Sequence, residues 1–341
     1  MLELSVVIPC RNEAKYMSRC LESILENGYD TSRFEVLVCD GMSDDGTRDI
    51  VAQYSEKYAK DTTIRLLDNP NRTVPYALNV AIRAALAPII LRMDAHSIMD
   101  AGYIEHCLAA LAAHPEAANV GGVFVNQYDT PEGRAIAAAM SSRFGVGNAG
   151  FRLAEADGYT DTVPYGCFRR EVFDKVGLFD EQLTRNQDDE LNFRIIEAGY
   201  KIWLDRRIRV LYYVRGDYAR LWRQYYQYGY WKVFVNRKHH TITSARQLAP
   251  AVWVAGLVVG AGLSLASSAL CLVYAMAIFT YAAATLYGAF RAANPHTDTL
   301  RVWQAFAVLH LSYGAGYWRG IWDFLIRRRR FATQSGQAFN R

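Results

Sequence analysis

Residues 35–47 read EVLVCDGMSDDGT, an apolar run that ends at Asp40 and is followed by a polar, glycine-containing turn. Similar short apolar runs occur at 4–8, 64–67 and 89–93, each followed by a polar turn and, after the first three of these four runs, by a helix-like stretch. Apolar runs bounded by turns predict strands, and strands that alternate with helices predict a parallel sheet. The amino-terminal part of the chain is therefore predicted to be a Rossmann-like α/β fold.

Polar side chains follow each of the four predicted strands. Arg11 to Glu13 come after the first, Asp40 after the second, Asp68 after the third and Asp94 after the fourth. In open α/β sheets the ligand binds beyond the carboxyl ends of the strands, so we expect these side chains to meet at one cleft. The glycine-rich fingerprint of dinucleotide-binding proteins is missing after the first strand, which favours a single nucleotide over NAD or FAD.

A long uncharged segment marks a change in character along the chain. Of 341 residues, 21% are charged, yet residues 248–290 contain no Asp, Glu, Lys or Arg. A helical membrane crossing needs about 20 residues, so these 43 residues predict two transmembrane helices with a tight turn near Ser267 and Ser268. A buried helix pair of a soluble protein is the alternative interpretation.

The segment at 302–326 is apolar and aromatic but includes His310, Arg319 and Asp323. A two-helix hairpin keeps every flanking basic group on the cytoplasmic side, whereas a third crossing would place the last of these groups outside. We therefore expect 302–326 to be re-entrant or interfacial. The flanking basic residues are Arg237, Lys238, Arg246, Arg291, Arg301 and Arg327 to Arg330.

The predicted organisation has five parts. They are a catalytic domain at 1–216, an amphipathic interface helix and linker at 217–247, two transmembrane helices at 248–290, the re-entrant or interfacial segment at 302–326, and a basic cytoplasmic tail at 327–341. Aromatic and basic residues interleave within 217–237, which suits a membrane interface, although a core aromatic stripe has the same pattern. Glycine and polar residues at 145–161 predict a mobile loop near the active site.

Charge and cysteine usage narrow the partners and the compartment. The net charge of +4 is modest, and its basic runs flank apolar segments, which suits anionic lipid headgroups and gives no sign of nucleic-acid binding. The six cysteines are scattered singly, which suits a reduced, cytoplasmic catalytic domain. With no leader peptide recognised at the amino terminus, we expect a multi-pass protein of the bacterial inner membrane.

Five motifs carry a resemblance to a known family. They are VVIPCRNE (6–13), VLVCDGMSDDGT (36–47), RMDAH (92–96), TVPYGCFRREVF (162–173) and QDDELNFR (187–194). Together they resemble the family 2 glycosyltransferases, which have a GT-A fold, and in particular the bacterial exopolysaccharide enzymes of the succinoglycan glucosyltransferase type. The resemblance covers essentially the whole chain.

The resemblance implies roles for the residues at the strand ends. Asp40 is implied to bind the nucleoside, and the loop after the first strand is implied to contact its base and ribose. Asn12 and Glu13 could instead simply start the following helix. The nucleotide-sugar-binding residues implied in this way are Pro9, Arg11, Glu13, Asp40 and Asp94.

Asp94 and His96 stand where the family carries its aspartate, any residue, aspartate metal motif. The second aspartate is replaced by histidine here. A carboxylate with an imidazole suits Mn²⁺ somewhat better than Mg²⁺, and either divalent cation could bridge the two phosphates of a nucleotide sugar. The alternative is a strand-terminal Asp and His in a solvated turn.

The fourth and fifth motifs imply the acceptor side. Gly166 would allow close approach of a sugar, and Tyr165 could stack on its face. Alignment of the fifth motif places the base at Asp188, with Asp189 as the other choice because the usual preceding glutamate is Gln187 here. The role of Glu190 could be limited to the helix macrodipole.

By this resemblance, the chain is an inverting glycosyltransferase. It would move a hexose such as glucose from a UDP-sugar or similar donor to a saccharide linked to a membrane polyprenyl diphosphate, in exopolysaccharide or cell-surface glycan synthesis. One alternative is a polyprenyl-phosphate sugar synthase, which uses a bare lipid phosphate. An alternative of another class is a non-catalytic nucleotide-sugar-binding subunit of a polysaccharide assembly complex.

Overall fold

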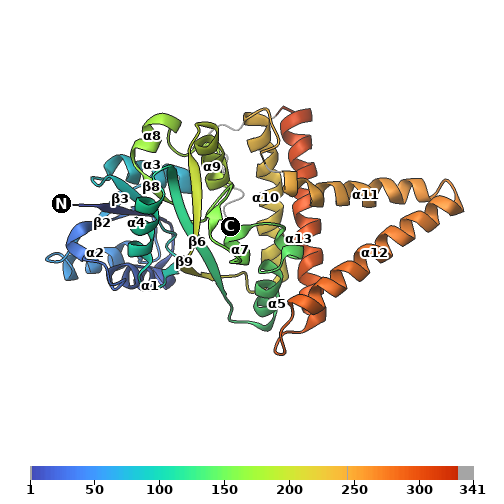
Figure 1. Cartoon of the computed structure of the whole chain (residues 1–341), viewed down its shortest axis with the longest axis horizontal. Coiled ribbons are helices and arrows are strands. Elements are labelled where there is room, and N and C mark those ends of the chain that lie inside the picture. The colour runs from blue at the N-terminus through green and yellow to red at the C-terminus, as the bar shows by residue number, and fades with distance from the viewer. Residues whose placement is uncertain (1, 244, 329–341) are drawn as a thin grey trace. The chain divides into compact units, whose positions relative to one another are not determined.

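The computed structural model describes residues 2–243 and 245–328 (Figure 1). These residues form two compact units, the first built from 2–125 and 154–213 and the second from 126–153 and 214–328. Most of the predicted basic tail, from residue 329 onward, lies outside the described residues. The insertion at 126–153, which falls within the predicted catalytic range of 1–216, belongs to the second unit.

The first unit is organised around a mixed sheet. Within the described residues, the strand order is β3-β2-β1-β4-β8-β6-β9-β5, with β7 paired to β9. β2, β3 and β4 are parallel to β1, whereas β8 pairs with β4 in the antiparallel direction. The four predicted strands and the parallel half of the sheet are therefore confirmed. The strands are β1 (Leu4–Cys10), β2 (Phe34–Asp40), β3 (Thr63–Asp68), β4 (Ile89–Arg92), β5 (Ser97–Met99), β6 (Ala117–Gln127), β7 (Gly158–Tyr159), β8 (Cys167–Arg169) and β9 (Lys201–Tyr213).

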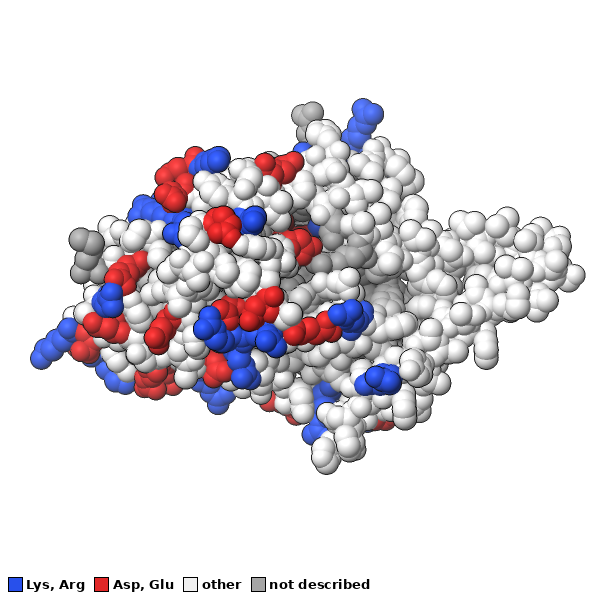
Figure 2. Space-filling model, in the orientation of Figure 1, with Lys and Arg blue, Asp and Glu red and all other residues white. Residues whose placement is uncertain are grey.

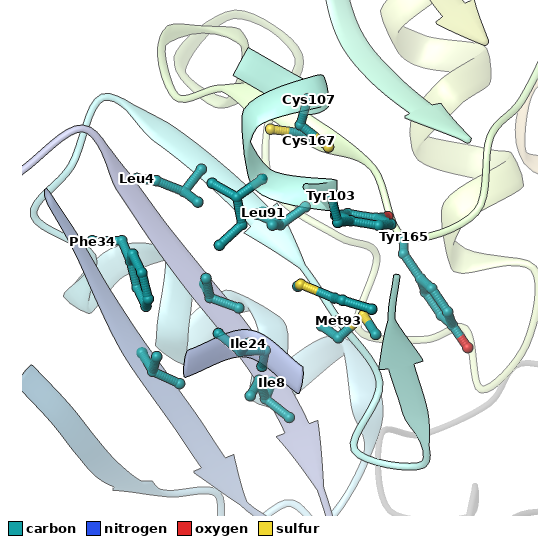
Figure 3. Packing of buried hydrophobic residues seen from close by; sticks show 14 of the residues in the cluster. Leu4, Ile8, Ile24, Phe34, Leu91, Met93, Tyr103, Cys107, Tyr165 and Cys167 are labelled. Carbon is teal, nitrogen blue, oxygen red and sulfur yellow. The ribbon is translucent and has the colours of Figure 1, made fainter. Parts of the chain in front are cut away.

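Helices cover this sheet through their apolar faces. In α1, the residues spaced three and four apart are buried, which is the pattern of a helix with one face against a core. Figure 3 shows Ile24 of α1 beside Ile8 of β1, with Leu91 of β4 and Tyr103 of α4 in the same cluster. The helices of this unit are α1 (Ala14–Leu25), the 3-10 turn η1 (Thr31–Arg33), α2 (Thr47–Lys57), α3 (Val74–Ala84), α4 (Tyr103–Ala113), α8 (Glu171–Val176) and α9 (Gln187–Glu197).

The second unit is helical. Its elements are α5 (Pro131–Met140), α6 (Arg143–Val146), α7 (Gly150–Leu153), α10 (Tyr218–Lys238), the 3-10 turn η2 (Ala245–Leu248), α11 (Ala249–Ser264), α12 (Ser268–Ala292), α13 (Thr299–Gly320) and the π-helical turn η3 (Ile321–Ile326). α10 and α13 pack closely because glycines face the opposing backbone. A Cβ on Gly316 would lie 2.0 Å from the carbonyl oxygen of Tyr226, and one on Gly229 would lie 2.0 Å from that of Tyr313. Small residues allow such close approach of two helices.

The segments outside the sheet form defined elements. In α10, Tyr230 and Trp231 are buried and pack with Phe324, whereas Trp222 is 41% exposed. The segment at 302–326, predicted to be re-entrant or interfacial, lies in the continuous helix α13 with η3, and α13 packs against α10, α11 and α12. The predicted loop at 145–161 contains the end of α6 and the short elements α7 and β7.

The uncharged segment forms a helical hairpin. α11 and α12 meet at one end, and few of their side chains are buried (Figure 1). Among the described helices, α12 alone is long and apolar enough to cross a membrane, with 25 residues and a mean hydropathy of 1.9, whereas α11 has 16 residues. Residues 249–290 carry no charged side chain, Arg291 in the last turn of α12 is the first after them, and the projecting part of the hairpin is white on the face that Figure 2 shows. Of the two predicted membrane crossings, α12 is therefore long enough to be one and α11 is not.

Candidate active site

The loops after β1 and β2 are tied together at one edge of the sheet. The backbone N–H of Asn12 donates to Ser43 Oγ at 2.8 Å, and that of Glu13 donates to Thr47 Oγ1 at 2.9 Å. Asp45 accepts from the backbone N–H of Ala14 at 3.0 Å. The N–H of Ala14, the first residue of α1, and those of the two residues before it are therefore satisfied by the neighbouring loop, and the Glu13 side chain does not cap its own helix.

Asp40 is buried, and its carboxylate accepts hydrogen bonds from donors within the fold. Its side chain is 0% exposed. It accepts hydrogen bonds from the backbone N–H and the hydroxyl of Ser43, from Arg48 Nη1 at 2.8 Å, and from the Cys10 thiol. A carboxylate offers about four acceptor positions, so this set uses them all. Asp40 therefore shapes the loop and positions Arg48, and its predicted direct contact with a nucleoside would require one of these donors to leave.

Two arginines lie near Asp40, of which Arg11 is exposed and Arg48 is about a third exposed. Arg48 also pairs with Asp68 at 2.8 Å, and the Asp68 side chain is 61% exposed. Arg11 is exposed, and within the described part of the chain no carboxylate is paired with it. Pro9 is buried in β1, beyond the Leu4 to Val7 stretch that pairs with β4, so its missing N–H removes no bond of that pairing.

His96 lies next to Glu13. The distance from His96 Nδ1 to Glu13 Oε1 is 3.2 Å, and about a third of the imidazole is exposed. A carboxylate on one ring nitrogen fixes the orientation of the imidazole. The structure therefore brings Glu13, predicted as a nucleotide contact, to the predicted metal ligand His96.

Arg92 connects the predicted metal ligand with the predicted base. Its Nη2 donates to Asp94 Oδ1 at 2.9 Å, and its Nη1 donates to Asp188 Oδ1. The Arg92 side chain is 4% exposed, whereas Asp94 and Asp188 are 21% and 32% exposed. Both carboxylates therefore remain accessible beside a buried guanidinium.

The two carboxylates have opposite pKa shifts. Burial would raise the pKa of Asp94, but Arg92, His96 and Arg185 outweigh it, so the pKa lies below its ordinary value. For Asp188, burial outweighs Arg92, and Asp94 and Asp189 add to it, so the pKa is raised. An ionised ligand beside a more basic carboxylate is the arrangement that metal binding and general-base catalysis need.

The remaining residues of the fifth motif hold α9 in place. Glu190 is fully buried and makes a two-point ion pair with Arg194, at 2.9 Å to Nε and 2.7 Å to Nη2. Arg194 also donates to the carbonyl oxygens of Gly177 and Leu178. Glu190 therefore anchors α9 to the preceding loop, which is a larger role than the predicted effect on the helix macrodipole.

Tyr165 and Gly166 are both buried. Tyr165 is 4% exposed, and its hydroxyl accepts a hydrogen bond from Ser97 at 2.8 Å. A Cβ on Gly166 would lie 2.3 Å from Asn119 Oδ1, so glycine is required by internal packing. Both residues therefore have a structural role, and their contact with an acceptor sugar stays a prediction.

The residues present suit a metal ion whose coordination shell is completed by a bound ligand. Within the described residues, no group of three or more His, Cys, Asp or Glu side chains could hold a metal ion. As the predicted ligands, Asp94 and His96 would supply a partial set, and Mg²⁺ sites of this kind are completed by substrate phosphates and water.

Comparison with known proteins identifies the family. The family model described as glycosyl transferase family 2 matches residues 5–177. The chain belongs to the family 2 glycosyltransferases. Its relatives include the succinoglycan biosynthesis protein ExoA of Rhizobium meliloti, with 32% identity over 96% of both chains. A dolichyl N-acetyl-α-D-glucosaminyl phosphate 3-β-D-2,3-diacetamido-2,3-dideoxy-β-D-glucuronosyltransferase of Methanococcus voltae is 28% identical over 69% of this chain and 74% of the relative.

A solved structure confirms the fold of this family 2 glycosyltransferase. The mannosyltransferase PcManGT from Pyrobaculum calidifontis, in complex with GDP-Man and Mn²⁺, superposes with a TM-score of 0.66 at 21% identity, over 94% of this chain and 87% of the other. The predicted GT-A fold is therefore confirmed for the glycosyltransferase.

Arg92, Arg48 and Arg185 were not among the predicted site residues, whereas Arg11 was. Arg92 was quoted as part of a motif, but a charged residue at the end of an otherwise apolar strand is itself a signal, because Arg is rarely buried without a partner. Arg48 and Arg185 gave no such signal, since both lie in polar surroundings. Their partners in this glycosyltransferase are far from them in sequence or depend on how the loops fold.

Proposed function

We propose that the chain transfers a hexose from a UDP-sugar or similar donor to a lipid-linked saccharide, with inversion at the anomeric carbon, during exopolysaccharide or cell-surface glycan synthesis. The observation that carries this proposal is the Asp94–Arg92–Asp188 array, in which a ligand of low pKa and a carboxylate of raised pKa share one buried guanidinium. This array supports a reaction whose leaving-group side and base side share one site.

Asp188 is the proposed base. It takes the proton from an acceptor hydroxyl as that oxygen forms a bond to the anomeric carbon, while the bond from this carbon to the diphosphate oxygen breaks. One displacement of this kind inverts the anomeric centre. Asp189 is the second choice, because it is adjacent in α9 and raises the pKa of Asp188.

The donor's diphosphate would be held at the other end of the array. Asp94 and His96 would bind a divalent cation, Mn²⁺ or Mg²⁺, which supplies charge stabilisation to the departing nucleoside diphosphate. Glu13 orients His96. The exposed Arg11 follows β1, and the partly buried Arg48 of α2 binds Asp40 at the end of β2, where the nucleotide is expected. Asp40 contributes by positioning Arg48.

The uncharged hairpin supports a membrane-bound acceptor. We propose that α11 and α12 attach the protein to the bacterial cytoplasmic membrane, with the catalytic unit on the cytoplasmic side. The relative from Methanococcus voltae is named for transfer to a dolichyl-linked sugar phosphate. This name favours a lipid-linked sugar over a bare lipid phosphate as the acceptor of the present chain.

The test is release of nucleoside diphosphate from UDP-, GDP- and TDP-sugars by the full-length protein in detergent with membrane lipid extract, with and without Mn²⁺. Consumption of one donor that requires both metal and lipid is the expected result. No consumption of any donor, with an extract that supports a known lipid-dependent transferase, would favour the non-catalytic subunit.

The same assay separates the two enzymatic readings. Extract in which lipid-linked sugars have been removed by mild acid, supplemented with polyprenyl phosphate, supports a polyprenyl-phosphate sugar synthase but not the proposed transferase. Product formation under these conditions would overturn the acceptor assignment while leaving the transferase reaction intact.

A further inference from the structure

Arg92 is the first residue of the RMDAH motif at 92–96, and no role was predicted for it. Its backbone is fixed on both sides, since β4 pairs with β1 at Val7 and the Arg92 N–H donates to the carbonyl oxygen of Gly166 at 3.0 Å. The guanidinium lies 5.5 Å from the centre of the Tyr165 ring, whose hydroxyl is held by Ser97. The strand and the ring therefore hold this arginine in one orientation.

The strained backbone of Tyr165 adds to this arrangement. Tyr165 has a φ of 46°, a conformation that non-glycine residues adopt at a cost and that surrounding contacts must maintain. The buried ring packs beside Arg92, and its hydroxyl accepts a hydrogen bond from Ser97 of β5. This explains why a bulky side chain is kept at a strained position: it forms one wall for the guanidinium.

Only the two carboxylates take the guanidinium's hydrogen bonds. Nη1 donates to Asp188, Nη2 donates to Asp94, and the buried Nε has no hydrogen-bond partner among the described residues. Two hydrogen bonds from one planar group set the separation and the relative orientation of both carboxylates, which a single ammonium group cannot do. Asp94 keeps its second oxygen for a cation.

We propose that Arg92 is a positioning residue that sets the spacing between the metal-side carboxylate and the base. This inference rests on the proposed function of Asp94 and Asp188. A displacement reaction requires the attacking and leaving oxygens to lie on opposite sides of the anomeric carbon, so small errors in this spacing lower the rate strongly. Arg92 therefore affects turnover through Asp188 and metal affinity through Asp94.

Two substitutions test this role in the full-length protein. Arg92→Lys keeps the charge but loses the two-point contact, and Arg92→Met removes both. We expect either change to lower kcat for UDP-glucose transfer about 100-fold with little change in donor KM. We also expect it to weaken Mn²⁺ binding about 10-fold, measured by electron paramagnetic resonance with UDP present. Arg65→Lys is the matched control, because Arg65 pairs with the buried Glu35 at 2.7 Å on the same sheet.

A double variant separates this inference from the proposed function. If Arg92 acts through Asp188, the variant Arg92→Met/Asp188→Asn is no slower than Asp188→Asn alone, within about threefold. Losses that multiply would overturn the inference, as would wild-type kcat and Mn²⁺ affinity in Arg92→Lys. Full activity of Asp188→Asn would instead refute the base assignment. If Arg92→Met does not fold, Arg92→Lys and its double variant with Asp188→Asn give the same comparison.

Discussion

At the scale of single residues, the site is made of buried charges that hold exposed ones. Arg92 positions Asp94 and Asp188, and Asp40 positions Arg48. In each case a side chain with little exposure uses its hydrogen bonds inside the protein and leaves its partner accessible. Substitutions at buried and at exposed members of a pair should therefore have different consequences.

The first prediction concerns metal affinity. His96→Ala removes a ligand and Glu13→Gln removes the charge that orients it, so both should weaken Mn²⁺ binding about 10- to 100-fold in the presence of UDP. Calorimetric titration measures this directly, without turnover. Asp49→Asn is the control, because Asp49 is an exposed carboxylate of α2. Unchanged affinity in both variants would mean that Asp94 and the diphosphate hold the metal without His96.

The second prediction concerns the pH dependence of stability. Burial would raise the pKa of Asp40, but the bonds from Ser43 and Arg48 outweigh it and lower the pKa below 3.8. A lowered folded pKa contributes stability above the unfolded pKa, and this contribution is lost as the pH falls through the folded pKa. Asp40→Asn should therefore lower the unfolding free energy by about 2 kcal/mol at pH 7, with a smaller difference below pH 3.8.

Calorimetric unfolding between pH 3 and 7, with Asp49→Asn as the exposed control, checks this behaviour of Asp40. A difference between Asp40→Asn and the wild type that stays constant with pH would show that the carboxylate is not stabilised by its ionised form.

At the scale of the elements, the sequence predicted the strands better than the surroundings of the helices. Each apolar run of the parallel half became a strand because its flanking turns and length left no alternative. The aromatic pattern of α10 was ambiguous, since burial against α13 and contact with a membrane surface both require one apolar face. Gly229 and Gly316 favour burial, because without a side chain they let the backbone of the opposing helix come close.

The third prediction concerns the α11–α12 hairpin. Cys271 near the start of α12 is exposed, whereas the other five cysteines are buried. If the hairpin is inserted in lipid, Cys271 should resist a charged, membrane-impermeant maleimide in opened membrane vesicles and react after detergent solubilisation. A cysteine at position 49, introduced as Asp49→Cys, should react in both states. Equal labelling of Cys271 and of position 49 in vesicles would exclude insertion.

At the scale of the whole molecule, motifs and spacing were enough to predict the family, the GT-A fold and the uncharged hairpin. They were not enough to show which site residues are exposed. Asp40 and Tyr165 match the motifs, yet both are buried against residues from other strands, Cys10 of β1 for Asp40 and Ser97 of β5 for Tyr165. The link from Arg92 to Asp188 joins residues 96 positions apart and could not be predicted from spacing.

The most direct test of the account measures transfer of labelled glucose from UDP-glucose to lipid extract by Asp188→Asn and Asp189→Asn side by side with the wild type. We predict that Asp188→Asn loses transfer by about 100- to 10,000-fold while it still binds UDP and Mn²⁺, and that Asp189→Asn keeps most of its activity. Transfer by Asp188→Asn at the wild-type rate, with the loss found in Asp189→Asn, would contradict the assignment of the base.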